Sequence, residues 1–265
     1  MGTEVLIATV KDGIGTVQLN RPDVLNALNL EVGKRLLDVL EEWKKDERIR
    51  VVVVKGHPHC FSAGADLKFI KEIQQDPEKF PLEMVRFLEC LRPSVEALAA
   101  FPRPTIAVVE GIAFGGGCEL ALACDLRIAT PQAKFALPEV KIGLLPAAGG
   151  TQRLPRLIGA ARAKELLFTG KTVTASEAER LGLVNRVVPA EALEESLVSL
   201  IAELISVSPF AQQLIKRCVD VGLNTSLAEG LAFEFQAAAT LGYSEDAMEG
   251  VSSFIEKRPA RFTGR

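Results

Sequence analysis

The chain has 265 residues, of which 48% are hydrophobic and 25% are charged, and its formal net charge is −3. This length and apolar content allow one large domain or one domain with an appendage, and the charged fraction is ordinary for a soluble globular protein. The sequence pI near 5.7 argues against a dedicated nucleic-acid binder, because such proteins are usually basic.

No apolar run reaches the roughly 20 residues needed to cross a bilayer, and the first residues lack the basic and then apolar pattern of a secretory signal. The five cysteines are odd in number and scattered, which is typical of reduced thiols. We therefore expect a cytoplasmic protein.

The first part of the chain predicts a β-hairpin, a helix and a buried strand. Residues 5–10 and 15–20 read as strands joined by the turn signal Lys11-Asp12-Gly13. Residues 30–45 carry apolar side chains at helical spacing, and residues 49–54 form a short β-branched run typical of a buried strand.

Strand, turn and helix then recur along the chain. The predicted elements are a helix entered from the turn at 61–67, a helix at 81–100, a buried strand at 105–109, a helix at 117–123, and short strands at 126–129 and 134–136. This recurrence predicts an α/β fold whose strands are covered on both faces.

From about residue 190 the pattern changes to helices alone, at 190–206, 209–222, 226–241 and 244–257. We therefore predict a core at residues 1–190 and a helical C-terminal subdomain at residues 191–265.

Two glutamates lie in apolar surroundings, each beside a turn that contains glycine. Glu119 is the only charge in residues 113–124, and Glu139 has Lys141 as its only charged companion in residues 135–146. A buried carboxylate is costly unless it is compensated, and burial that raises its pKa makes it a good proton donor. Alternatively, Glu119 could face outward or pair with a cation, and Glu139 could cap a turn.

Two turns of small residues could present backbone amides to a ligand. Gly115, Gly116 and Gly117 follow a strand and precede a helix, but they match neither a Walker loop nor a dinucleotide-binding fingerprint. The turn at residues 61–67 has the same form. The N–H groups of Ala63 and Gly116 could together form an oxyanion hole, although a tight turn without a ligand is the simpler explanation of the glycines.

Other chemistries find less support in the residues. Asp66 precedes a predicted helix, so a helix N-cap is favoured over a catalytic role. The only histidines, His57 and His59, share one loop, and no further ligands accompany them for a metal site. A nucleophilic triad would have to use one of these two histidines. We therefore predict no metal.

Longer motifs resemble the enoyl-CoA hydratase/isomerase (crotonase) superfamily over nearly the whole chain. They are the segments at 19–22, 26–28, 61–67, 111–127, 138–146, 149–154 and 254–258. The resemblance implies a spiral of ββα units, with C-terminal helices that form trimers, often paired into hexamers.

The resemblance also implies roles for the residues above. Ala63 and Gly116 would bind the thioester oxygen of an acyl-CoA, and residues 63–66 (Ala63, Gly64, Ala65 and Asp66) with Gly116 would line the CoA site. Glu119 would act as general base and Glu139 would protonate the α-carbon of a 2-enoyl-CoA during hydration. No cofactor is expected, because CoA enters as part of the substrate.

The alternatives are a Δ3,Δ2-enoyl-CoA isomerase, a hydratase for a branched substrate such as 3-methylglutaconyl-CoA, and a non-catalytic acyl-CoA or RNA-binding relative. The joint presence of two acids favours hydration, in the breakdown of fatty acids or related acyl-CoA thioesters. Three departures from the family pattern stand out: Ala147 replaces a usual glycine, Asp23 replaces a common lysine, and the segment 68–82 is longer than in many straight-chain hydratases.

Overall fold

The computed structural model describes residues 4–265, which form two compact units. The first unit comprises residues up to 101 and residues 105–197, and the second comprises residues 102–104 and 198–265. The strands all belong to the first unit, and the second is helical. The division falls inside helix α8 (Leu193–Ile205), a little beyond the boundary predicted after residue 190.

The first unit is built on two sheets. The larger sheet has the strand order β1-β2-β3-β5-β7-β10 and the smaller has the order β4-β6-β8-β9. Within them, β1 pairs antiparallel with β2 and β8 with β9, and the other pairs are parallel. The bounds are β1 Leu6–Lys11, β2 Ile14–Leu19, β3 Val51–Lys55, β4 Cys60–Ser62, β5 Thr105–Val109, β6 Ile112–Phe114, β7 Leu126–Ala129, β8 Lys134–Ala136, β9 Val173–Thr174 and β10 Arg186–Val187.

Successive strands alternate between the two sheets. The pairs β3–β4, β5–β6 and β7–β8 each place one strand in the larger sheet and the next in the smaller, and a helix follows each pair. The predicted α/β class and the spiral of ββα units are therefore confirmed.

The arrangement of the smaller sheet decides where the functional turns lie. Strands β4, β6 and β8 are parallel neighbours, with Ser62 opposite Ala113 and Phe114 opposite Ala136. The carboxyl ends of parallel strands meet at one edge of a sheet, which is where α/β proteins commonly bind ligands. The turns that follow residues 62, 114 and 136 are brought together at this edge.

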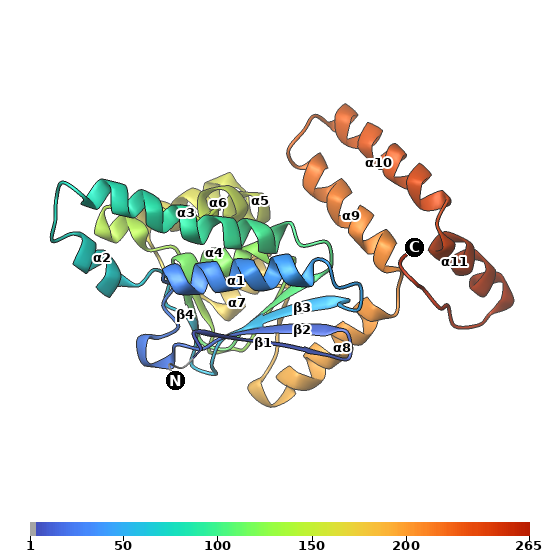
Figure 1. The fold of residues 1–265 in the computed structure, drawn as a ribbon, viewed down its shortest axis with the longest axis horizontal. Coiled ribbons are helices and arrows are strands. Elements are labelled where there is room, and N and C mark those ends of the chain that lie inside the picture. Colours follow the sequence, from blue (N-terminus) through green and yellow to red (C-terminus); the bar gives the residue numbers. More distant parts are fainter. Residues whose placement is uncertain (1–3) are drawn as a thin grey trace. The chain divides into compact units, whose positions relative to one another are not determined.

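Within the described residues, seven α-helices accompany these sheets. Their bounds are α1 Leu30–Trp43, α2 Leu67–Ile73, α3 Phe80–Ala99, α4 Gly116–Ala123, α5 Gly150–Ile158, α6 Ala160–Thr169 and α7 Ala175–Leu181. Helix α1 begins where the Val32 N–H donates to the Asn29 side chain, and it buries its apolar face. Helices α1 and α3 lie side by side along the unit (Figure 1).

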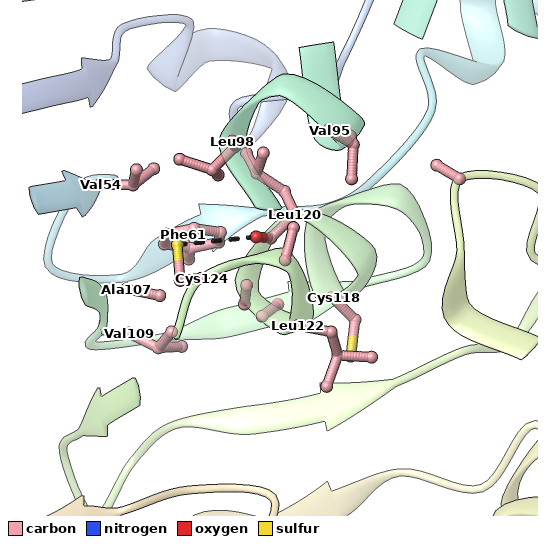
Figure 2. Close-up of a cluster of buried hydrophobic side chains, with 14 of the residues drawn as sticks. Val54, Phe61, Val95, Leu98, Ala107, Val109, Cys118, Leu120, Leu122 and Cys124 are labelled. Carbon is pink, nitrogen blue, oxygen red and sulfur yellow. Dashed lines mark hydrogen bonds between the residues drawn. The ribbon is translucent and has the colours of Figure 1, made fainter. Parts of the chain in front are cut away.

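Helix α4 passes through the hydrophobic core of the first unit. Figure 2 shows Cys118, Leu120 and Leu122 of this helix in the cluster of apolar side chains that includes Phe61 and Leu98. All but the first residue of α4 are buried. A helix that is buried on every side is held by the core around it, so the groups at its N-terminus have fixed positions.

The second unit contains α9 (Pro209–Gly222), α10 (Leu227–Gly242) and α11 (Glu245–Glu256). Helices α9 and α10 pack along one another, and a capping box of Ser226 and Glu229 begins α10. The C-terminal segment returns to the start of α11, where the Thr263 and Gly264 N–H groups donate to Asp246 at 2.7 and 3.0 Å.

No single helix within residues 4–265 is long and apolar enough to cross a membrane, and the bent pair at 190–205 and 209–222 reaches that length only in combination.

Candidate functional site

The turn after β4 presents one backbone amide that has no hydrogen-bond partner among the described residues, that of Ala65. Its neighbours are engaged: the Ala63 N–H donates to the Leu25 carbonyl at 2.9 Å, that of Gly64 to the Ser62 hydroxyl at 3.1 Å, and that of Asp66 to the Leu28 carbonyl at 2.9 Å. The prediction that Ala63 supplies an oxyanion-hole donor is therefore wrong, because Leu25 already accepts from its amide. Ala65 is the donor left at this turn.

The turn after β6 presents a second amide. Gly115 adopts φ 51° and ψ −129°, a conformation that glycine adopts readily, and α4 begins at the next residue. Gly116 is the first residue of the helix, and its N–H has no acceptor among the described residues. A free amide at a helix N-terminus favours a negatively charged or polarised oxygen.

The two amides are close neighbours. A methyl group placed on Gly116 would lie 3.8 Å from the Ala65 nitrogen, and one placed on Gly64 would lie 3.1 Å from the Gly116 nitrogen. Gly64 has φ 94°, and that second methyl group would also lie only 2.6 Å from the Phe114 carbonyl oxygen. Glycine at position 64 is therefore required for the two turns to pack together.

Glu119 lies on the first turn of α4 and is only 3% exposed. Its Oε1 accepts from the backbone N–H groups of Ala148 and Gly150, both at 2.8 Å. Burial raises the pKa of this carboxyl, and the two amides together with the Arg153 charge oppose the rise. The alternative that Glu119 faces outward is therefore excluded.

Glu139 begins the short 3-10 helix Glu139–Ile142 that follows β8. Its carboxyl lies beside the second turn, since a methyl group on Gly115 would be 3.0 Å from its Oε1. The other oxygen, Oε2, is buried and has no hydrogen-bond partner among the described residues. Burial raises the pKa of Glu139 to about 7, and the nearby charge of Glu119 adds to the rise.

The structure thus brings together four predicted or reassigned groups: the carboxyls of Glu119 and Glu139 and the amides of Ala65 and Gly116. The Glu119 carboxyl has two hydrogen-bond donors that stabilise its charge. The Glu139 carboxyl has a buried oxygen that no donor of the described residues contacts. This pair can hold one proton between them beside an oxyanion site, which is an arrangement suited to acid–base chemistry on a carbonyl compound.

Asp66 has a structural role, and the predicted N-cap is confirmed. Its side chain accepts from the Lys68 and Phe69 N–H groups at the start of α2. It also forms an ion pair with Arg21 at 2.9 Å. These contacts explain why a carboxylate stands at this position, and no catalytic role is needed.

The departure at position 147 does not strain the backbone. The φ angle of Ala147 is not positive, whereas that of Gly149, two residues later, is 108°. The amides on either side of that glycine, those of Ala148 and Gly150, are the ones that hold Glu119. Alanine at position 147 is therefore compatible with the loop.

Both histidines lie in the turn between β3 and β4, where the backbone of His57 pairs with that of Cys60 through two hydrogen bonds of 3.0 Å. Within residues 4–265, no group of three or more His, Cys, Asp or Glu side chains is placed to hold a metal ion.

Sequence reasoning missed four contributors to the site. The amides of Ala148 and Gly150 hold Glu119, and Asn26 and Ser62 support the turn that carries Ala65. The available signal was that Asn26 and Ser62 lie in the motifs at 26–28 and 61–67. The hydrogen bonds that join these two segments, however, link residues that are remote in sequence.

Comparison with known proteins gives this site a family context. Residues 9–265 match the family model described as enoyl-CoA hydratase/isomerase. The chain is 39% identical over 269 residues to the probable enoyl-CoA hydratase echA8 of Mycobacterium bovis, with all of both chains covered. It is 41% identical over 261 residues to the mitochondrial enoyl-CoA hydratase domain-containing protein 2 of Mus musculus, covering 96% of this chain and 85% of that protein.

Solved structures agree with the fold. The crystal structure of an enoyl-CoA hydratase from Bacillus anthracis matches with a TM-score of 0.92 at 36% identity, covering 98% of this chain and 100% of the other. A structure from Geobacillus kaustophilus, described as an enoyl-CoA hydratase subunit, matches with a TM-score of 0.90 at 41% identity, covering 99% and 100%. The crotonase fold expected from the motifs is confirmed.

Proposed function

Because the chain belongs to the enoyl-CoA hydratase/isomerase family, we propose that it adds water across the 2,3 double bond of a 2-enoyl-CoA thioester to give a 3-hydroxyacyl-CoA. The observation that carries the proposal is the pair of shielded carboxyls, Glu119 and Glu139, beside two adjacent unpaired amides. A non-catalytic acyl-CoA binder has no need of two carboxyls whose charge is costly to bury.

The amides of Ala65 and Gly116 are the proposed oxyanion hole. The thioester oxygen lies between them, and negative charge develops on that oxygen as water attacks the β-carbon. One donor in such a hole typically contributes ~3 kcal/mol to lowering the barrier. The surrounding backbone of Gly64 and Asp66, and the neighbouring Ala63, line the part of the site that takes the CoA thioester.

The two carboxyls divide the proton transfers. Glu119, whose charge is stabilised by two amides, takes a proton from the water while the water oxygen bonds to the β-carbon. Glu139, whose raised pKa keeps a proton near neutral pH, gives that proton to the α-carbon. Each positioned acid or base typically contributes about 10²–10⁴-fold to the rate.

The wider role follows from the substrate class. A hydro-lyase acting on 2-enoyl-CoA belongs in the breakdown of fatty acids or related acyl-CoA thioesters, and the composition favours the cytoplasm. The reaction needs no cofactor besides the CoA carried by the substrate.

The second unit is the proposed assembly surface for a trimer or a dimer of trimers. Its helices expose large apolar side chains, including Phe235 and Leu227 on α10 and Phe254 and Ile255 on α11, with Phe254 86% exposed. Large exposed apolar side chains gathered on a few helices are characteristic of faces that become buried in an oligomer.

A panel of thioesters tests the reaction class. The protein is incubated separately with crotonyl-CoA, a 3-enoyl-CoA and 3-methylglutaconyl-CoA, and the products are identified. Loss of the conjugated-thioester absorbance with crotonyl-CoA supports hydration. Conversion of the 3-enoyl-CoA without hydration of crotonyl-CoA would instead establish an isomerase, and binding without turnover of any of them would establish a non-catalytic binder.

A further inference from the structure

The segment Arg21–Leu28 lies along the backbone of residues 60–66 and is joined to it by a series of hydrogen bonds. From this we infer that Asn26 is a positioning residue that sets the direction of the Ala65 N–H without contacting the substrate. The inference rests on the proposed function, because it makes Asn26 responsible for the geometry of the proposed oxyanion hole.

Asn26 is 2% exposed and has φ 51°, a conformation that asparagine tolerates better than most residues. Its Oδ1 accepts from the Arg21 N–H at 2.9 Å. Its Nδ2 donates to the carbonyls of Cys60 and Phe61 at 3.0 and 3.1 Å. The amide nitrogen is therefore bound to the strand that leads into the Ala65 turn, and the amide oxygen is bound to the start of the segment that carries Asn26.

Ser62 continues this network into the turn. Its hydroxyl donates to the Asn26 carbonyl at 2.8 Å and accepts from the Gly64 N–H at 3.1 Å, and its side chain is fully buried. Ser62 also contacts the second turn, because a methyl group on Gly117 would lie 2.5 Å from the Ser62 carbonyl oxygen. One small network thus sets the position of both turns that carry the hole.

The pattern of satisfied amides follows from this network. The carbonyls of Leu25 and Leu28, on either side of Asn26, accept from Ala63 and Asp66, while Ser62 accepts from Gly64. Among residues 63–66, only the Ala65 N–H has no acceptor in the described part of the chain, so it is the one left for a ligand. Stabilisation by an oxyanion hole depends on donor position, and a misplacement of about 1 Å can cost about 10²-fold in rate.

The test uses Asn26→Gly, which removes all three side-chain hydrogen bonds while glycine accepts the positive φ. We expect kcat for crotonyl-CoA to fall about 10–100-fold with KM changed less than about threefold, because the hole acts mainly on the transition state. The second readout is para-dimethylaminocinnamoyl-CoA, whose absorbance moves to longer wavelength when its carbonyl oxygen is hydrogen-bonded. The variant should bind this probe and lose most of that shift.

Two controls separate positioning from general stability. Asn20→Ala removes an asparagine whose side chain bonds to the Glu4 carbonyl, away from the turn. Val39→Ala opens a space in the core under α1 and lowers Tm without touching the turn. Both should keep the wild-type spectral shift and kcat.

Ser62→Ala provides a second route to the answer if Asn26→Gly does not fold, and it should lose a smaller part of the shift. A wild-type shift and kcat in Asn26→Gly, or in Ser62→Ala where the first variant does not fold, would overturn the inference. Wild-type protein that shifts the probe yet fails to hydrate crotonyl-CoA would contradict the proposed function alone.

Discussion

Glu119 and Glu139 are close enough for the charge of one to raise the pKa of the other. Burial adds to the cost of ionising both, so the pair is expected to carry a single negative charge near neutral pH. The amides of Ala148 and Gly150 favour that charge on Glu119, and the partnerless Oε2 of Glu139 favours the proton there. The environment therefore assigns the base and the acid.

The first prediction concerns the proton donor. Glu139→Gln keeps the size of the side chain and removes the transferable proton, so kcat for crotonyl-CoA should fall about 10²–10⁴-fold. Binding of CoA should change little. Steady-state kinetics and a CoA binding titration measure the two effects, with the exposed Glu191→Gln as the matched control. Near-normal turnover in Glu139→Gln would refute the assignment.

The second prediction concerns stability and pH. The pKa of Glu139 is raised from 4.5 to about 7 in the folded protein, so the folded state binds this proton more tightly than the unfolded state. The resulting stabilisation is complete below pH 4.5 and is lost as the pH rises through about 7.

Glu139→Gln has no such proton to lose. Relative to wild type, its free energy of unfolding should improve by about 1–2 kcal/mol between pH 5 and pH 8, allowing for the solvent exposure of a half-buried group. Urea unfolding at the two pH values measures this difference. Parallel pH dependences of wild type and variant would show that the pKa of Glu139 is ordinary.

At the scale of elements, the packing of α4 against β4 depends on Gly117. A methyl group there would lie 2.5 Å from the Ser62 carbonyl oxygen and 2.6 Å from its Cβ. Gly117→Ala should therefore lower the free energy of unfolding by about 1–3 kcal/mol, even though alanine is the better helix former. Gly242→Ala, at the end of α10 with open space around it, is the control and should not destabilise. Equal effects of the two variants would contradict this packing argument.

Most of the elements that sequence reasoning located are long enough to show a period, although the short strands β7 and β8 were located as well. Helix α1 and the buried strands β3 and β5 lie within a few residues of their predicted bounds. Strands β4 and β6 have only three residues each, which is too short for a recognisable alternation. Helices α5–α7 were not predicted, because Gly159, Gly170 and Gly182 divide that region into helices of only 9, 10 and 7 residues.

The site was predictable only in part, because local sequence shows unusual residues but not the long-range contacts that they make. Glu119 and Glu139 were identifiable as isolated charges in apolar segments. The choice of Ala63 over Ala65 failed because the free amide of a turn is decided by its acceptors, and here the acceptors are Leu25 and Leu28, which come from a distant part of the chain. Local patterns do not report such pairings.

At the scale of the whole molecule, assembly is the property that the second unit is expected to control. Phe254→Glu places a charge on one of its exposed apolar positions, and a charge buried without a partner is costly at an interface. The variant should elute as a smaller species in size-exclusion chromatography with light scattering. Gln132→Glu, at an exposed position of the first unit, should leave the mass unchanged. A monomeric wild-type protein would contradict the proposed assembly.

The most direct measurement is the fate of crotonyl-CoA in isotopically labelled water. We expect a product that carries the oxygen label on its β-carbon, and a greatly reduced rate of labelling in both Glu119→Gln and Glu139→Gln. Unlabelled thioester after prolonged incubation with wild-type protein, or labelling that proceeds unchanged in both variants, would contradict the claim that these two carboxyls add water beside the paired amides.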